Sequence, residues 1–97
     1  MNQYGRRAQR YWQQHLPSQY AQIEDPTAFF DEMGQTLAQQ IEDLAEAIAR
    51  RSPSTQDFMA NLGRLNRAKD EAEIEVFREM LPQPESASPN EDDPADA

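Results

Sequence analysis

The chain of 97 residues contains no cysteine, one histidine and three glycines. The lack of cysteine excludes disulfides, thiol catalysis and thiolate metal sites. The glycines, at Gly5, Gly34 and Gly63, are too far apart for a glycine-rich phosphate loop. General acid–base catalysis by His15 needs a positioned partner, and no short-range pattern supplies one. We therefore expect no enzymatic activity, no cofactor and no small-molecule substrate.

Long apolar runs are also missing. No segment reaches the roughly 18 consecutive apolar residues of a membrane-spanning helix. The amino-terminal bases are not followed by the apolar segment of a signal peptide. These observations predict no membrane association and a cytoplasmic location.

Large aliphatic and aromatic residues are scarce. Leu, Ile, Val and Phe account for 15 of the first 81 residues, and the net charge is −9. Such a composition is typical of disordered chains, yet the apolar residues recur with helical period. We therefore expect a thin helical fold that cannot enclose a full core alone and buries its apolar stripes against a partner or a second copy.

The segment 25–51 is the strongest helix prediction. Its apolar residues recur at steps of three and four, which places them on one face. Asp25 is a suitable N-cap, and Pro26 suits the first helical position. Gly34 costs about 1 kcal/mol in a helix interior and indicates either a tolerated exposed glycine or a close helix crossing. The stripe consists of Phe30, Met33, Leu37, Ile41, Leu44 and Ile48.

A second long helix is predicted over residues 55–81, with Ser52 or Ser54 as its cap. Lys69 interrupts the apolar stripe of this helix. The carboxyl-terminal half of the helix carries the wider apolar surface, since a second set of apolar residues lies beside the main stripe. The residues that we assign to the interface on this helix are Phe58, Leu62, Leu65, Val76, Phe77 and Met80.

The remaining segments complete an all-α fold class. Residues 2–15 are predicted as a short aromatic helix, and residues 16–25 as an irregular bend that lays it across the first long helix. The fold class is thus an antiparallel helical hairpin with a short amino-terminal helix packed on it. We divide the chain into a helical domain, 1–81, and an acidic, proline-rich tail, 82–97, which we expect to be disordered.

This pattern favours a helical protein–protein interaction module with coiled-coil-like stripes: an adaptor, an assembly factor or a regulatory accessory subunit. The partner is another protein or a second copy, with a homo-oligomer expected. Charge alternates in blocks along the chain and would set the orientation of the partners. Residues 24–46 carry seven acids and no base, and residues 47–69 carry five bases against Asp57.

Two alternatives remain open. A nucleic-acid-associated regulator would use the basic and aromatic run near the amino terminus, since Arg contacts phosphate and aromatic rings stack on bases. This run consists of Arg6, Arg7, Arg10, Tyr11 and Trp12. An acidic inhibitor that occupies a basic groove on a nucleic-acid-processing enzyme would use the acidic face of the first long helix. This face consists of Asp31, Glu32, Glu42, Asp43 and Glu46.

A metal site on the acidic face is the weaker interpretation of its carboxylates. Glu42 and Glu46 have a helical spacing of four, which occurs in carboxylate bundles. Those bundles also use Glu-x-x-His pairs, and the sequence contains none. We therefore expect solvated charge on this face and no bound metal.

Overall fold

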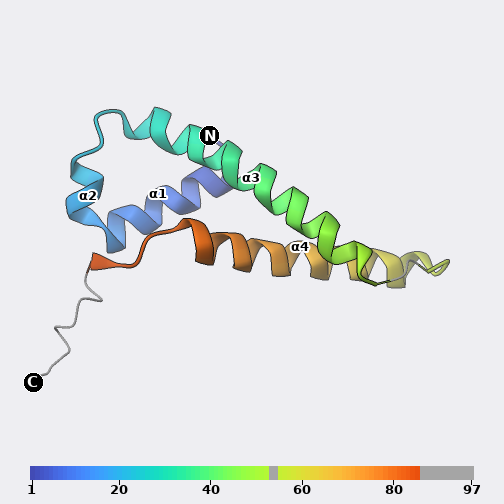
Figure 1. The fold of residues 1–97 in the computed structure, drawn as a ribbon. Helices are drawn as coiled ribbons and strands as arrows, with labels where there is room; N and C mark the ends of the chain where they lie inside the picture. Colours follow the sequence, from blue (N-terminus) through green and yellow to red (C-terminus); the bar gives the residue numbers. More distant parts are fainter. Residues whose placement is uncertain (53–54, 86–97) are drawn as a thin grey trace, which may run out of the picture. The chain divides into compact units, whose positions relative to one another are not determined.

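A computed structural model describes residues 1–52 and 55–85 of the chain. Within these residues the chain forms helices and no strand (Figure 1). The helices are α1 (Gln3–His15), α2 (Pro17–Ala21), α3 (Pro26–Arg50) and α4 (Phe58–Met80). The predicted all-α fold class is therefore confirmed.

The chain divides into two compact units. Unit 1 comprises Met1–Gln35 together with Leu81–Ala97, of which the described part ends at residue 85. Unit 2 comprises Thr36–Met80. The helix α3 contributes its first part to unit 1 and its second part to unit 2.

The helices α3 and α1 each begin directly after a capping side chain. At the start of α3, the carboxylate of Asp25 accepts a hydrogen bond from the Ala28 backbone N–H at 3.2 Å. At the start of α1, the Asn2 side chain accepts from the Gly5 backbone N–H at 2.9 Å. Each side chain satisfies a backbone donor that the first helical turn leaves without a partner. The predicted ranges 25–51 and 2–15 are thus confirmed to within a residue at each end.

Between these helices the structure differs from the expected irregular bend. Residues Pro17–Ala21 form the short helix α2. Pro17 occupies its first turn, where proline has a suitable fixed φ and the missing N–H costs nothing. No side chain of the preceding residues caps this helix.

The helix α4 begins three residues later than predicted. Its cap is Asp57, whose Oδ1 accepts from the backbone N–H groups of Met59 at 3.1 Å and Ala60 at 3.5 Å. The predicted capping residue Ser54 lies outside the described residues. A carboxylate is a hydrogen-bond acceptor and also places a negative charge at the positive end of the helix. Asp57 is therefore a favourable N-cap for α4.

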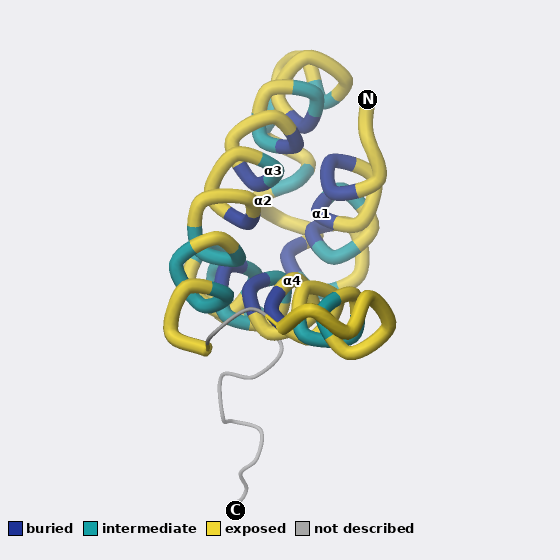
Figure 2. Tube along the Cα trace, turned by 90° about the vertical axis from the view of Figure 1, so that its right-hand side faces the viewer, coloured by how far each residue is buried: buried dark blue, intermediate teal, exposed yellow. Residues whose placement is uncertain are grey.

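The core of unit 1 is an aromatic cluster. The ring of Phe30 lies 5.6 Å from that of Trp12 and 6.0 Å from that of Tyr20, between ring centroids. Phe29 adds an edge contact to Trp12 at 5.4 Å. Phe30 and Leu16 are fully buried. Buried positions recur along α1 and α3 (Figure 2). Residues from α1, α2 and α3 therefore share one apolar interior, and edge-to-face ring pairs of this kind add about 0.5–1.5 kcal/mol each.

Two glycines allow α1 and α3 to approach closely within unit 1. The Asn2 side-chain amide donates to the carbonyl of Gly34 at 3.0 Å. A Cβ added to Gly34 would lie 2.9 Å from the Gly5 nitrogen, and one added to Gly5 would lie 2.5 Å from the Phe30 carbonyl oxygen. Both glycines are buried. Of the two interpretations of Gly34, the close helix crossing is the one that the structure shows.

We expect Gly34→Ala to destabilise the protein, although alanine has the higher helix propensity. The gain in propensity is about 1 kcal/mol. The added methyl group would meet backbone atoms of α1, and relieving such overpacking costs about 1–3 kcal/mol. Urea unfolding followed by far-UV circular dichroism should show a lower midpoint.

Gly63→Ala is the matched control. This glycine also lies inside a helix, but a Cβ there would meet only the end of the Arg67 side chain at 3.5 Å. We expect a stability equal to that of the wild type or higher by up to about 1 kcal/mol. Equal stability of both alanine variants would contradict the close crossing.

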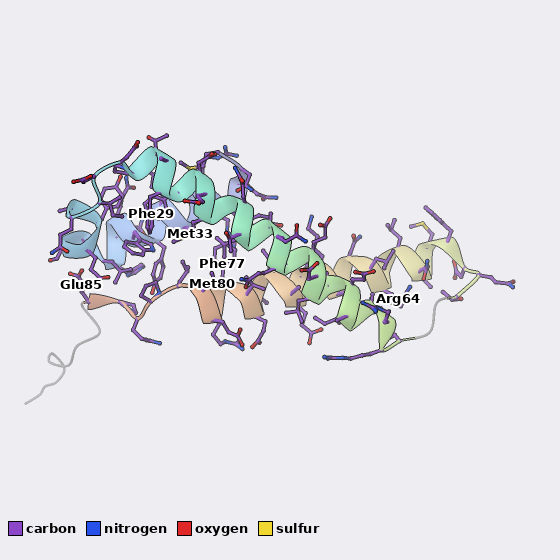
Figure 3. All side chains as sticks on the ribbon, turned by 45° about the horizontal axis from the view of Figure 1, so that its top comes forward. Phe29, Met33, Arg64, Phe77, Met80 and Glu85 are labelled. Atoms are coloured by element: carbon purple, nitrogen blue, oxygen red, sulfur yellow. The ribbon has the colours of Figure 1, made fainter. Side chains whose placement is uncertain are left out.

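The segment after α4 is held on unit 1 and is called here the C-terminal strap, residues 81–85. The Tyr11 hydroxyl donates to the Pro82 carbonyl at 2.7 Å. The Glu85 carboxylate accepts from the backbone N–H groups of Gln19 at 3.1 Å and Ser18 at 3.4 Å (Figure 3). The predicted tail, 82–97, therefore begins with a segment in which Pro82 and Glu85 contact the helical part. Its other residues, 86–97, lie outside the described residues.

Removing the strap contacts should weaken unit 1. We expect Tyr11→Phe to lower the free energy of unfolding by about 0.5–1.5 kcal/mol, because the phenol hydrogen bond is lost and the ring is retained. Fluorescence of Trp12, the only tryptophan, reports on unit 1 during urea unfolding. Gln83→Ala, at an exposed strap position, is the control and should leave the midpoint unchanged.

Candidate interaction surface

Unit 2 is a helical hairpin. The second part of α3 and the whole of α4 belong to it, and the loop between them reverses the chain direction (Figure 1). Leu37 and Ile41 of α3 are buried, as are Ala68, Ala72 and Val76 of α4. The predicted antiparallel hairpin of two long helices is present in this unit.

Arg64 ties α4 to the end of α3. Its Nη1 donates to the carbonyl of Ala49 and, at 3.3 Å, to that of Ser52. Its Nε and Nη2 donate to the Asn61 side-chain oxygen at 3.1 and 2.9 Å (Figure 3). The last carbonyls of a helix have no partner within it and carry partial negative charge, so a guanidinium satisfies both needs.

The contact of Arg64 with the end of α3 fixes how far the two helices overlap along their length. Ala49 is one residue from the end of α3 at Arg50. Phe58 precedes Arg64 by six residues, or about 9 Å along the helix axis at 1.5 Å per residue. The first turns of α4 therefore extend past the last turn of α3, and α3 has no residue to cover them.

A stripe of large apolar side chains begins on these turns and continues to Leu65; it consists of Phe58, Met59, Leu62 and Leu65 and is called here the α4 patch. Positions 58, 62 and 65 lie on one helical face, and position 59 adjoins it. The exposed fractions are 73% for Phe58, 69% for Met59, 40% for Leu62 and 44% for Leu65.

An open groove of about 520 Å³ adjoins the α4 patch on unit 2. Its apolar floor comes from two alanines of α3 and from Leu65, which belongs to both the groove and the patch. Because alanine side chains are short, the space beside Leu65 stays unfilled. The lining residues are Ala45, Glu46, Ala49, Arg50, Ser52, Arg64 and Leu65.

The twelve predicted interface residues divide by burial. Phe30, Leu37, Ile41 and Val76 are buried in the chain and give a partner no surface. Met33, Leu44, Ile48, Phe77 and Met80 are half-buried. Phe58, Leu62 and Leu65 are exposed.

The two halves of α4 differ in exposure. The carboxyl-terminal half was predicted to carry the wider apolar surface, covered by the amino-terminal helix or another subunit, and there Phe77 is half-buried while Ile74 is exposed. The amino-terminal half carries the larger exposed stripe. Met59 was missed, although its spacing of three from Leu62 places it beside the stripe.

The aromatic residues proposed for nucleic-acid contact are held inside unit 1. Trp12 is 9% exposed and packs on two phenylalanines, so it cannot stack on a base. Tyr11 is half-buried and donates to the C-terminal strap. The bases Arg6, Arg7 and Arg10 are exposed. The run therefore offers charge without the interleaved rings that a stacking site needs.

The acidic face of α3 engages mainly in local contacts. Asp31 lies 3.2 Å from the amino-terminal ammonium group, and Asp43 accepts from Gln39 at 3.1 Å. Glu46 lies 3.8 Å from Arg50, one turn away. Glu32 and Glu42 are exposed. Ion pairs at such exposed positions contribute about 0–1 kcal/mol.

Across residues 1–52 and 55–85, no group of three or more His, Asp or Glu side chains is placed to hold a metal ion. None of the helices in those ranges combines the length and apolarity needed to cross a membrane. His15 lies 4.8 Å from the Tyr11 ring, between centroids.

Comparison with protein-family models, curated proteins and solved structures gives no match for this chain. Any functional assignment therefore rests on the α4 patch and the groove beside it.

We expect Arg64→Ala to loosen the hairpin. The end of α3 would lose the donor to its last carbonyls, at a cost of about 1–2 kcal/mol. Hydrogen exchange should rise at the backbone amides of residues 47–51, and thermal unfolding should begin at a lower temperature. Arg67→Ala removes a neighbouring exposed arginine, and we expect it to change neither measurement. Unchanged exchange in Arg64→Ala would mean that the guanidinium does not hold the helices together.

Proposed function

We propose that this chain is a cytoplasmic, non-enzymatic protein–protein interaction module that binds through the α4 patch. It would serve as an adaptor, an assembly factor or a regulatory accessory subunit. The observation that carries this proposal is the exposed stripe of Phe58, Met59, Leu62 and Leu65 on a helix whose buried residues are Ala68, Ala72 and Val76.

The energetics support association at this surface. Single exposed apolar side chains are common on soluble proteins, but a contiguous group beside an apolar groove marks a binding site. Burying a Phe, Leu or Met side chain completely gains about 1.5–3 kcal/mol. A partner that covers the α4 patch and fills the groove therefore has several kcal/mol available to offset the entropy of association.

The partner in this proposal is another protein or a second copy of the chain. Both would use the same apolar contacts, so the surface is proposed without fixing the stoichiometry. The nucleic-acid alternative has less support, because Trp12 belongs to the interior of unit 1. The acidic-inhibitor alternative has no apolar surface of comparable size on the face that it would use.

The test compares two aspartate substitutions at apolar, exposed positions of α4. Leu62→Asp places a charge in the α4 patch, and Ile74→Asp places one at a position that is 61% exposed outside the patch. We expect both variants to keep the far-UV circular dichroism and melting temperature of the wild type. Leu62→Asp should abolish association, measured by sedimentation velocity for self-association and by co-purification for a partner, and Ile74→Asp should not.

Two results would overturn the proposal. The first is a wild-type chain that sediments as a monomer at every concentration and recovers no partner that depends on Leu62. The second is equal association by Leu62→Asp and the wild type.

A further inference from the structure

We propose that the α4 patch and its groove bind an acidic amphipathic helix of another protein. This inference rests on the proposed function and adds the chemistry of the partner. It follows from the distribution of charge around the apolar side chains.

The patch lies in a basic block of an acidic chain. The net charge is −9, yet residues 47–69 carry five bases and one acid. That acid, Asp57, caps α4 and accepts from two backbone N–H groups. The charged residues within the segment 58–69 are Arg64, Arg67 and Lys69, and Glu46 lines the groove on the side of α3.

The basic side chains lie along the edges of the apolar surface. Lys69 follows Leu65 by four residues, so it ends the stripe on the same helical face. The Arg67 guanidinium lies near Gly63, since a Cβ built there would be 3.5 Å from Nη1. Gly63 follows Met59 by one turn, and this places the guanidinium beside the patch.

The groove has a cation on its α3 side as well. Arg50 lines it, and its side chain is 70% exposed. Arg50 pairs with Glu46 at 3.8 Å, and such an exposed pair contributes about 0–1 kcal/mol. A partner carboxylate can therefore compete for Arg50 at little cost.

The dimensions favour a helix as the occupant. The stripe from Phe58 to Lys69 spans twelve residues, or about 16 Å, which is three helical turns. An amphipathic helix that lies in such a groove presents apolar side chains at spacings of three, four and seven residues. Its flanking acids would meet Lys69, Arg67 and Arg50.

A second copy fits this surface less well. If two copies paired their patches in an antiparallel arrangement, the segment 58–69 of one would face the same segment of the other. That segment contains three bases and no acid. Such a pairing sets like charges against each other, which costs specificity and affinity. The chain's own residues 86–97 carry acids but no large apolar side chain to fill the groove.

The test uses three synthetic helical peptides of equal length with identical leucines at spacings of three and four. The remaining positions are mostly Glu in the first peptide, Gln in the second and Lys in the third. Fluorescence anisotropy measures binding to the full chain. We expect the Glu peptide to bind about tenfold more tightly than the Gln peptide and the Lys peptide to bind least, because charge complementarity selects the partner. The preference should shrink as salt rises.

Charge reversal of the exposed cations provides the matched variants. In the double variant Arg67→Glu with Lys69→Glu, we expect about a tenfold loss of affinity for the Glu peptide and a gain for the Lys peptide. Arg78→Glu reverses an exposed arginine elsewhere on α4 and should leave all three affinities unchanged. Leu62→Asp should abolish binding of every peptide. Circular dichroism of each variant checks that it is folded.

The outcomes separate this inference from the function on which it rests. Equal binding of the three peptides, all lost in Leu62→Asp, would overturn the acidic partner and leave the interaction module standing. Absence of peptide binding together with Leu62-dependent self-association would overturn the acidic partner in favour of a second copy. Displacement of the Glu peptide by an oligothymidine would also overturn the acidic partner. Absence of both binding and self-association would overturn the acidic partner, and a co-purified partner that depends on Leu62 would then still support the module.

Discussion

The contact between Arg64 and the carbonyl end of α3 determines which residues of α4 stay exposed in unit 2. A helix end needs donors for its last carbonyls, and in this hairpin the donor comes from α4. Since the donor lies two turns into α4, the start of that helix is left without a neighbouring helix. The exposure of Phe58 and Met59 is thus a consequence of where a polar contact places the two helices along each other.

Small buried residues allow the helices of this chain to pack with few large side chains between them. Leu, Ile, Val and Phe are few in this chain, and Ala8, Ala68 and Ala72 take buried positions that larger side chains fill in other proteins. Alanine and glycine let helix backbones approach, as the contact of Gly34 with Gly5 shows. The small size of Ala45 and Ala49 leaves the space in which the groove lies. A chain with larger residues at those two positions would have no groove.

Local rules predicted the helices better than the surface. The period of α3 and the cap at Asp25 are properties of adjacent residues, so they were predicted from the sequence. The start of α4 was placed too early because serine and aspartate both cap helices, and only the structure shows that Asp57 does so. The exposure of Leu62 and Leu65 depends on the register between two helices, which no periodicity within one helix reveals. The role of Gly34 likewise depends on a partner helix that lies about thirty residues away in the sequence.

The C-terminal strap makes unit 1 discontinuous along the chain, whereas unit 2 is one continuous segment. The hydroxyl of Tyr11 bonds to a carbonyl 71 residues later. During synthesis, which proceeds from the amino terminus, the hairpin of unit 2 has all its residues before the last component of unit 1 leaves the ribosome. The aromatic cluster of unit 1 is therefore closed last, because its final segment is synthesised after the whole of unit 2.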